Sequence, residues 1–364
     1  MAAPIKAGGI DLPPVCLEIV GRVNDQLGSF VAAQRREMTD RDPSAEPLFA
    51  EIERVIRAGG KRLRPLFCCL GHMAAGAEVG EEAIRAAAAL ELLHTFAIVH
   101  DDVMDRSPTR RGSPSSWVHL AEEHRRGGYT GDAEGYGDAA AVLAGDMALV
   151  LADRALLESG FPTERLAPAQ RRYDRMRVEV VAGQYLDVLA AHRGSASEEE
   201  ARRIAVLKSG GYTVEAPVQI GAILGGAGEE LLGCLSGYGV ALGEAFQLRD
   251  DVLGTFGDPE LTGKDRDSDL LEGKRTVLLA KALAAASGED RRLLEERVGG
   301  ADLTSEELDR VRKVIEATGA LDATLELING LADQAKGALL SPPVPEPARG
   351  LLTQMADVVA VRHL

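Results

Sequence analysis

Apolar residues recur three and four positions apart through most of this 364-residue chain, and no other feature constrains its fold as strongly. Alanine, leucine, glutamate and arginine, which favour helices, dominate the stretches that show this spacing. The clearest stretches are residues 82–100, 141–158, 174–191 and 229–253. Runs that alternate β-branched and polar residues between turn signals are nearly absent. The sequence therefore predicts an all-α protein.

Proline- and glycine-containing segments interrupt the helical pattern, and we predict that they are irregular. They are an extended N-terminal segment at 1–15, a glycine-rich loop insertion at 127–138, and residues 254–269 and 340–350. The pattern assigns no role to the insertion. The segment 254–269 carries several charged residues that belong to a motif described below.

Charge and cysteine content limit the partners and the location of the protein. A net charge of -16 repels polyanions, so we expect no nucleic-acid partner, and an anionic ligand requires a local basic cluster. The four cysteines (Cys16, Cys68, Cys69 and Cys234) show no CxxC spacing, which favours a reducing cytoplasm and no structural zinc. The N-terminus lacks an apolar signal core, and no apolar run approaches the roughly 18 residues of a membrane span. We therefore expect a cytoplasmic protein without a membrane span.

Two pairs of adjacent aspartates end two long apolar stretches. In HTFAIVHDDVMD, Asp101 and Asp105 are four residues apart on a predicted helix, so their carboxylates share one face, while Asp102 points to one side. Two carboxylates about 5 Å apart repel by roughly 3 kcal/mol at an effective dielectric of 20, so a partly buried pair requires a cation or a proton. Magnesium, which prefers oxygen ligands, suits such a face. GEAFQLRDDVLG repeats the arrangement with Asp250 and Asp251.

The residues before each aspartate pair indicate whether the pair is a solvated acidic face or part of a site. An isolated DDxxD is more often a solvated acidic face than a site. Here Phe96–Val99 are apolar, so the first pair ends a buried helix face. Two acidic rims above apolar helices indicate a metal-bound diphosphate above a cavity for an apolar tail.

Basic residues form three compact groups that can bind phosphate oxygens. They are GGKRLRP at 59–65, RSPTRRG at 106–112, and Lys264 with EGKRT at 272–276. Any one group alone would be interpreted as a solvated basic turn. No GxxxxGK followed by serine or threonine occurs, so a nucleotide hydrolase is disfavoured. Acids that bind metal together with bases that bind phosphate indicate diphosphate chemistry.

Six motifs in order, GGKRLRP, HTFAIVHDDVMDRSPTRRG, GQYLD, KSGGYT, FQLRDDVLG and EGKRT, resemble those of the trans-isoprenyl diphosphate synthase (polyprenyl synthetase) family. The resemblance spans about residues 59–276. It implies a single-domain isoprenoid synthase bundle of helices around a central cavity, extending over residues 1–364, and a homodimer. It also implies a magnesium-dependent transfer of the prenyl group of an allylic diphosphate onto isopentenyl diphosphate, with release of diphosphate.

The resemblance assigns roles to individual residues. It implies that Asp101, Asp105 and Asp250 bind three magnesium ions, with Asp102 and Asp251 as auxiliary ligands. Isopentenyl diphosphate would be held by Lys61, Arg64, His94 and Arg111. The allylic diphosphate would be held by Arg110, Lys208, Ser209, Gln247, Lys264 and Lys274, of which Lys208 and Gln247 also act with the aspartates in catalysis. The released diphosphate serves as the base in this family, so no protein base is expected.

Product length would be set by the helix below Asp101, because one helical turn of about 5.4 Å corresponds to about one isoprene unit. Ala97 lies one turn below Asp101 and would open the tube, whereas the resemblance implies that the bulky Phe96 can close the floor further down; Leu93 completes this chain-length set. The pattern looks like that of geranylgeranyl diphosphate synthases. A farnesyl or a longer product is the alternative.

The chain departs from the family pattern at three positions, and two other functions share part of the pattern. The second aspartate motif ends in Gly254 instead of aspartate, and Asp265 and Asp267 stand where the family commonly has proline and glycine. A class I terpene cyclase shares DDxxD and magnesium, but it would not explain GGKRLRP or the lysines. A non-catalytic partner subunit would tolerate the loss of aspartates or basic residues, and this chain keeps both.

Overall fold

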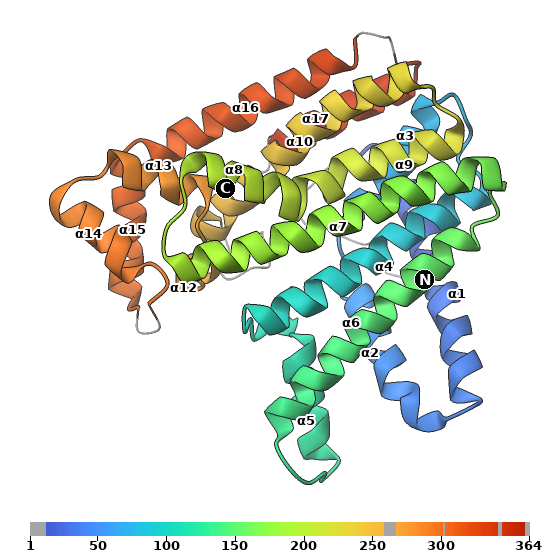
Figure 1. Cartoon of the computed structure of the whole chain (residues 1–364), viewed down its shortest axis with the longest axis horizontal. Coiled ribbons are helices and arrows are strands. Elements are labelled where there is room, and N and C mark those ends of the chain that lie inside the picture. The colour runs from blue at the N-terminus through green and yellow to red at the C-terminus, as the bar shows by residue number, and fades with distance from the viewer. Residues whose placement is uncertain (1–11, 258–266, 301–302, 341–343, 361–364) are drawn as a thin grey trace. The chain divides into compact units, whose positions relative to one another are not determined.

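The computed structural model describes residues 12–257, 267–300, 303–340 and 344–360 (Figure 1). Apart from one two-residue hairpin, the regular elements of these residues are helices, which confirms the predicted all-α class. The chain divides into two compact units, the first consisting mainly of residues 13–69 and 79–166 and the second mainly of 70–78 and 167–364. The single domain expected over 1–364 stays a prediction.

Unit 1 contains α1 (Pro14–Thr39), η1 (Pro43–Ala45), α2 (Glu46–Arg57), the first half of α3 (Leu63–Ala74), α4 (Glu81–Met104), β1 (Thr109–Arg110), β2 (Ser113–Pro114), α5 (Ser116–Arg126) and α6 (Ala133–Leu157). Helix α4 forms its centre, where Leu90, Leu92 and Leu93 are buried. Helix α6 packs on α4 through small residues that include Ala141, Ala144 and Ala148. These short side chains let the two helices approach closely.

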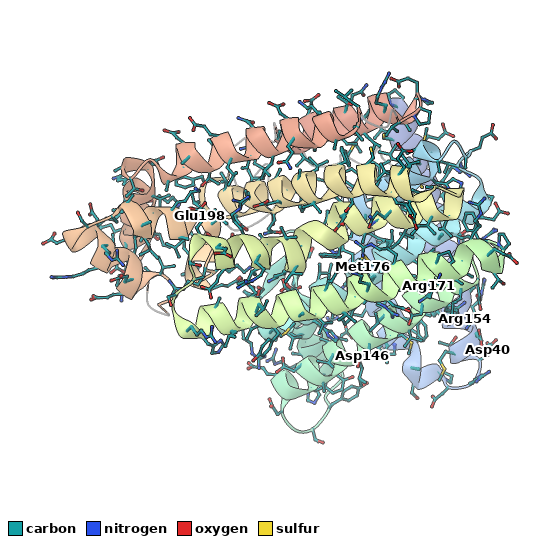
Figure 2. The ribbon with its side chains drawn as sticks, turned by 45° about the horizontal axis from the view of Figure 1, so that its top comes forward. Asp40, Asp146, Arg154, Arg171, Met176 and Glu198 are labelled. Carbon is teal, nitrogen blue, oxygen red and sulfur yellow. The ribbon has the colours of Figure 1, made fainter. Side chains whose placement is uncertain are left out.

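One face of α6 remains exposed in unit 1. It carries Leu143, Val150 and Leu157, which are spaced seven residues apart and therefore share one side of the helix. The charged side chains of Asp146 and Arg154 also project from α6 (Figure 2). An exposed row of aliphatic side chains on a helix is a feature that requires an explanation.

Unit 2 contains most of α7 (Thr163–Arg193), followed by α8 (Glu198–Ala205), η2 (Val206–Glu215), α9 (Ala216–Gly225), α10 (Glu229–Phe256), α12 (Ser268–Leu271), α13 (Val277–Ala285), α14 (Gly288–Arg297), α15 (Ser305–Ala317), α16 (Ala320–Ala338) and α17 (Ala348–Ala360). Helix α10 is central and lies beside α16 (Figure 1). It buries Leu235, Tyr238 and Leu242, and the Tyr238 hydroxyl donates to the Leu352 carbonyl at 2.8 Å. The long apolar stretch predicted at 229–253 is therefore the core helix of this unit.

The bounds of all four predicted irregular segments need correction. Helices take the ends of 254–269 and 340–350, because α10 continues to Phe256, α12 begins at Ser268 and α17 begins at Ala348. Helix α1 begins at Pro14, so the last two residues of the predicted N-terminal segment 1–15 are helical. The expected loop at 127–138 is shorter than predicted, because α6 begins at Ala133. Asp132 starts that helix by accepting hydrogen bonds from the amides of Glu134 and Gly135, as N-cap aspartates do. A polar, glycine-rich stretch concealed this helix start.

The statement that no apolar run could cross a membrane was too strong. Within the described residues, α4 is by length and composition apolar enough to cross a membrane. Of its apolar 18-residue window, however, 67% is buried in the protein. A core helix of a globular protein has the same length and composition. The burial of Leu90, Leu92 and Leu93 gives α4 that core role.

Candidate active site

The GGKRLRP loop of unit 1 joins α2 to α3 through backbone that few residues adopt. Gly59 and Gly60 have φ values of 88° and 150°, and Arg62 has a φ of 50°, in the left-handed region. A Cβ on Gly60 would lie 3.0 Å from Nη2 of Arg111. The absence of a side chain therefore lets the guanidinium of Arg111 approach the loop. Two basic groups that are about 50 residues apart in the sequence meet at this contact.

Arg111 reaches the loop from a tight hairpin. Strands β1 and β2 pair with Thr109 opposite Pro114 and Arg110 opposite Ser113, which leaves Arg111 and Gly112 as the two turn residues. Both have positive φ, 54° and 72°, as a type I′ turn requires. No alternating pattern predicts these strands, because each is only two residues long.

His94 lies on α4 within this basic cluster. Desolvation holds the pKa of His94 well below its ordinary value of 6.5, and the positive charges of Arg64, Arg111, Arg110 and Arg62 lower it further. The ring is therefore neutral at physiological pH and can donate one hydrogen bond without adding charge. Desolvation also lowers the pKa of the Arg111 guanidinium, while Glu91 opposes that shift. A cluster of arginines with a neutral histidine is suited to an anion that carries several oxygens.

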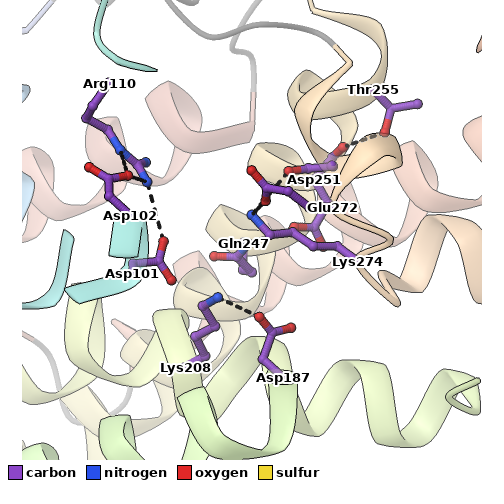
Figure 3. Close-up of polar contacts among 11 residues, drawn as sticks. Asp101, Asp102, Arg110, Asp187, Lys208, Gln247, Asp251, Thr255, Glu272 and Lys274 are labelled. Carbon is purple, nitrogen blue, oxygen red and sulfur yellow. Dashed lines mark hydrogen bonds and ion pairs between the residues drawn. The ribbon is translucent and has the colours of Figure 1, made fainter. Parts of the chain in front are cut away.

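The first aspartate motif lies at the end of α4. Asp105 is the C-cap residue, and its amide donates to the Asp101 carbonyl at 2.8 Å, so the predicted four-residue spacing is helical. Asp102 is buried, with 2% of its surface exposed, and accepts a hydrogen bond from Nε of Arg110 at 2.8 Å. Nη2 of Arg110 also lies 3.4 Å from Asp101 (Figure 3). Asp101 and Asp105 are more accessible than Asp102, which is what cation ligands require.

Arg110 has a different setting from the one expected. The family resemblance implies that it holds the allylic diphosphate, and the structure pairs it with the motif's own aspartates. This pairing neutralises a carboxylate that would otherwise be buried with its charge uncompensated. A direct role in binding substrate stays a prediction for Arg110.

In unit 2, Lys208 and Ser209 lie on the π-helical segment η2. Nζ of Lys208 lies 2.6 Å from Oδ2 of Asp187 on α7 (Figure 3). A Cβ on Gly183 would lie 2.3 Å from the Lys208 amide nitrogen, so this glycine lets η2 pack directly on α7. π-Helical turns occur frequently at functional sites because they redirect side chains. Asp187 was not predicted as a site residue from the sequence, although it is the last residue of the family motif GQYLD.

The second aspartate motif lies on α10. Asp251 is buried and accepts a hydrogen bond from Nε2 of Gln247 at 2.7 Å, whereas Asp250 is partly exposed. Burial raises the pKa of Asp251 to about 8; the negative charges of Asp269 and Asp250 add to this shift, and Gln247 and Lys274 oppose it. Nζ of Lys274 lies 2.6 Å from Glu272 and 3.5 Å from Asp269. Glu272, another residue that the sequence did not single out, is the first residue of EGKRT.

Two of the residues named from the sequence, Lys264 and Asp265, lie outside the described residues. Asp267 is described and accepts a hydrogen bond from Arg312 of α15. Gly254 lies inside α10, and a Cβ there would be 2.0 Å from Oδ2 of Asp269. Asp269 therefore occupies the space that a side chain at position 254 would need.

The chain-length candidates all lie on α4. Leu93 is buried, and Phe96 and Ala97 are partly buried. The Phe96 ring meets the His100 ring edge-on, with their centroids 4.7 Å apart. His100 packs against Gly145 of α6, where a Cβ would lie 2.3 Å from Cδ2 of the imidazole.

The carboxylates fit magnesium that arrives with a substrate. Among the residues that the structure describes, no three histidine, cysteine, aspartate or glutamate side chains gather closely enough to hold a metal ion by themselves. Magnesium commonly takes one or two carboxylates and completes its shell with water and substrate phosphates. Burial is the main cause of the raised pKa of Asp251, and the nearby carboxylates of Asp269 and Asp250 add to it; a divalent cation would offset both effects.

Comparisons with known proteins agree with this chemistry. Residues 46–317 match the family model of polyprenyl synthetases. The chain is 33% identical to geranylfarnesyl diphosphate synthase of Aeropyrum pernix, covering 85% of this chain and 92% of that one. It is 34% identical to (2E,6E)-farnesyl diphosphate synthase of Mycobacterium tuberculosis, over 78% of this chain and 77% of the other. A solved structure of geranylgeranyl pyrophosphate synthase from Corynebacterium glutamicum, complexed with isoprenyl diphosphate and magnesium, superposes with a TM-score of 0.91 at 36% identity, covering 95% and 99% of the two chains.

Proposed function

The chain belongs to the polyprenyl synthetase family and is a trans-prenyltransferase, and on this premise we propose that its main product is geranylgeranyl diphosphate. The substrates are isopentenyl diphosphate and an allylic diphosphate, namely the dimethylallyl, geranyl or farnesyl ester. The observation that carries the diphosphate chemistry is the arginine cluster around neutral His94 in the unit that also holds Asp101 and Asp105, and the twenty-carbon length is supported by Phe96 and Ala97 on α4 and by the solved geranylgeranyl pyrophosphate synthase that the chain resembles. One set of residues suits a diphosphate and the other suits its magnesium.

We assign the site residues as follows. Asp101, Asp105 and Asp250 hold magnesium, with three ions as the proposed number. Lys61, Arg64, His94 and Arg111 bind isopentenyl diphosphate. The allylic diphosphate is bound by Arg110, Lys208, Ser209, Gln247, Lys264 and Lys274.

The reaction breaks the allylic carbon–oxygen bond, joins the resulting carbocation to the alkene of isopentenyl diphosphate, and removes a proton to form the new double bond. When bound, magnesium supplies Lewis-acid stabilisation of the departing diphosphate. Lys208 and Lys274 contribute positive charge, and their carboxylate partners Asp187 and Glu272 hold the ammonium groups in position until a diphosphate competes for them. The proton passes to the released diphosphate, so no protein base is assigned.

Incubation of the purified protein with isopentenyl diphosphate, magnesium and each allylic diphosphate in turn, followed by mass spectrometry, tests this function. We expect mainly geranylgeranyl diphosphate, and we expect EDTA or Asp101→Ala to abolish it. Predominant farnesyl diphosphate or longer products would correct the chain length. Cyclic hydrocarbons would support a terpene cyclase, and no turnover with any starter would support a non-catalytic subunit.

The homodimer implied by the family is also a proposal. The exposed row of Leu143, Val150 and Leu157 on α6 supports it, because a second copy would remove these side chains from water. Light scattering after size-exclusion chromatography should give twice the chain mass. Val150→Glu should shift the protein toward the monomer, whereas the exposed Val240→Glu on α10 should not.

A cytoplasmic location is proposed on the basis of the cysteines. All four are buried thiols outside any disulfide, as a protein of a reducing compartment allows. Burial raises the pKa of Cys16 to about 11 and that of Cys69 to about 12, so these thiols are unreactive toward oxidants.

A further inference from the structure

A buried ion pair anchors the basic cluster of unit 1. Nη1 of Arg62, in the GGKRLRP loop, lies 2.5 Å from Oε1 of Glu91 on α4, and each side chain is only 4% exposed. Arg62 stands between Lys61 and Arg64 in the sequence, and Glu91 precedes His94 by about one helical turn. The pair therefore connects the loop that carries Lys61 and leads into Arg64 of α3 with the helix that carries His94.

Arg62 is held by more than this pair. Its Nε donates to Oδ1 of Asn24 on α1 at 2.8 Å, and its Nη2 donates to the carbonyl of Ile56 on α2 at 2.6 Å. All three guanidinium nitrogens are thus engaged with three different helices of one unit. The backbone of Arg62 has a φ of 50°, a conformation that persists in a residue with a β-carbon only where the surroundings enforce it. The side-chain contacts of Arg62 supply that enforcement.

Glu91 also acts on the neighbouring charges. It supports the charged form of Arg111, while Arg62, Arg110 and Arg64 oppose that form. Arg111 in turn packs against Gly60 of the same loop, where a Cβ would lie 3.0 Å from its Nη2. Loop, hairpin and α4 are therefore brought together around one buried carboxylate.

We propose that Arg62 and Glu91 are positioning residues for the diphosphate of isopentenyl diphosphate, an inference that rests on the proposed function. They do not contact the substrate. They hold the loop at 59–62 and the first turn of α3 in the conformation in which Lys61, Arg64 and Arg111 face one anion. The arrangement is preorganised, so the substrate does not have to order the loop on binding.

A change at Glu91 distinguishes a positioning role from a purely electrostatic one, because the two predict opposite changes in the affinity for isopentenyl diphosphate. Glu91→Gln makes the cluster more positive by one charge, and electrostatics alone would then strengthen the binding of an anion. It also leaves the Arg62 guanidinium buried without its counter-charge, which drives Arg62 and the loop out of place. The proposal therefore predicts weaker binding in spite of the added positive charge.

The experiment measures the KM for isopentenyl diphosphate with saturating farnesyl diphosphate and magnesium, and the Kd for isopentenyl diphosphate by calorimetry. For Glu91→Gln we expect both constants to rise at least about tenfold, equivalent to about 1.4 kcal/mol. We expect kcat and the KM for farnesyl diphosphate to stay within about threefold of the wild type. Asn24→Ala, which changes no charge, should raise the same two constants by a smaller factor.

Glu51→Gln is the matched control. Glu51 is a buried carboxylate of the same unit, and it pairs with Arg54 at 2.6 Å on the same helix, outside the loop. This variant should lower the melting temperature without raising the KM for isopentenyl diphosphate. If Glu91→Gln binds isopentenyl diphosphate as tightly as the wild type or more tightly, the inference is wrong. If Glu91→Gln does not fold, unchanged constants for Asn24→Ala contradict it; a wild type that neither binds nor converts the substrate contradicts the proposed function instead.

Discussion

His94 combines a desolvated ring with four nearby arginines, and this setting links its protonation to stability. Its pKa in the folded protein lies well below 6.5, whereas in the unfolded chain it is about 6.5. Between these two values the unfolded state binds more protons, so the free energy of unfolding rises with pH, by up to about 1.4 kcal/mol per pH unit. His94 therefore costs stability as the pH falls below about 6.5.

We predict that His94→Asn loses less stability than the wild type between pH 7.5 and pH 5.5, by about 1 kcal/mol. Urea unfolding followed by far-UV circular dichroism at the two pH values measures this difference. His192→Asn, which changes an exposed histidine on α7, is the control and should follow the wild type. Parallel curves for His94→Asn and the wild type would show that desolvation of the ring is not significant.

Gly254 is the position at which the chain departs from the second aspartate motif of its family. Restoring aspartate there would place a Cβ 2.0 Å from Oδ2 and 2.6 Å from Cγ of Asp269. We predict that Gly254→Asp lowers kcat/KM for the allylic diphosphate about tenfold or more, because Asp269 and its partner Lys274 must move. Steady-state kinetics with farnesyl diphosphate measures the change.

Two further variants make the Gly254 prediction specific. The exchange Gly254→Asp with Asp269→Gly removes the collision and should recover part of the lost activity. Gly233→Asp adds the same side chain to an open position on the same helix and should have little effect. A Gly254→Asp enzyme as active as the wild type would show that Asp269 moves aside without cost.

At the scale of the elements, the sequence predicted the features that depend on local spacing, namely the long helices and the residues that share one helical turn. The apolar periodicity located α4, α6, α7 and α10, and the four-residue spacing placed Asp101 and Asp105 on one helical turn. Local spacing could not predict which side chains from distant segments form ion pairs. Arg62 and Glu91 are 29 residues apart, and Lys208 and Asp187 are 21 apart, so no local period reports their contact. Which of two adjacent aspartates is buried also depends on the tertiary structure, through the partners Arg110 and Gln247.

Helix α4 carries the prediction of product length. Ala97 lies one helical turn before Asp101, and Phe96 is fixed in part by its edge contact with His100. We predict that Phe96→Ala lengthens the main product by at least one isoprene unit, because one turn of about 5.4 Å is opened. Ala97→Phe should shorten the main product for the opposite reason. Chromatography of the dephosphorylated products measures both changes.

A matched control separates chain length from stability. Phe49 of α2 is 3% exposed and belongs to the core of the same unit. Phe49→Ala should destabilise the protein by about 3 kcal/mol or more without changing the product distribution. If both Phe96→Ala and Ala97→Phe give wild-type products, these residues do not set product length.

At the scale of the whole molecule, the chain contains two compact units, and two of the boundaries between them fall inside helices. One lies between Cys69 and Leu70 within α3, and another between Leu166 and Ala167 within α7, whereas the boundary between Glu78 and Val79 lies in the connection from α3 to α4. Unfolding either unit alone would have to break both helices. Helix propagation is cooperative, and Phe67, Cys69 and Leu70 of α3 are buried, so such a break exposes apolar surface as well.

We therefore predict one cooperative unfolding transition, as a single domain requires. Trp117 is the only tryptophan and lies on α5, with its indole donating to the Ser107 carbonyl at 3.0 Å, so its fluorescence reports unit 1 alone. Far-UV circular dichroism reports the helices of both units. The two signals should have the same midpoint in guanidinium chloride, and Trp117→Phe should keep the dichroism midpoint close to that of the wild type. A fluorescence midpoint clearly separated from the dichroism midpoint would mean that the two units are independent domains, because unit 1 would then unfold while the helices of unit 2 persist.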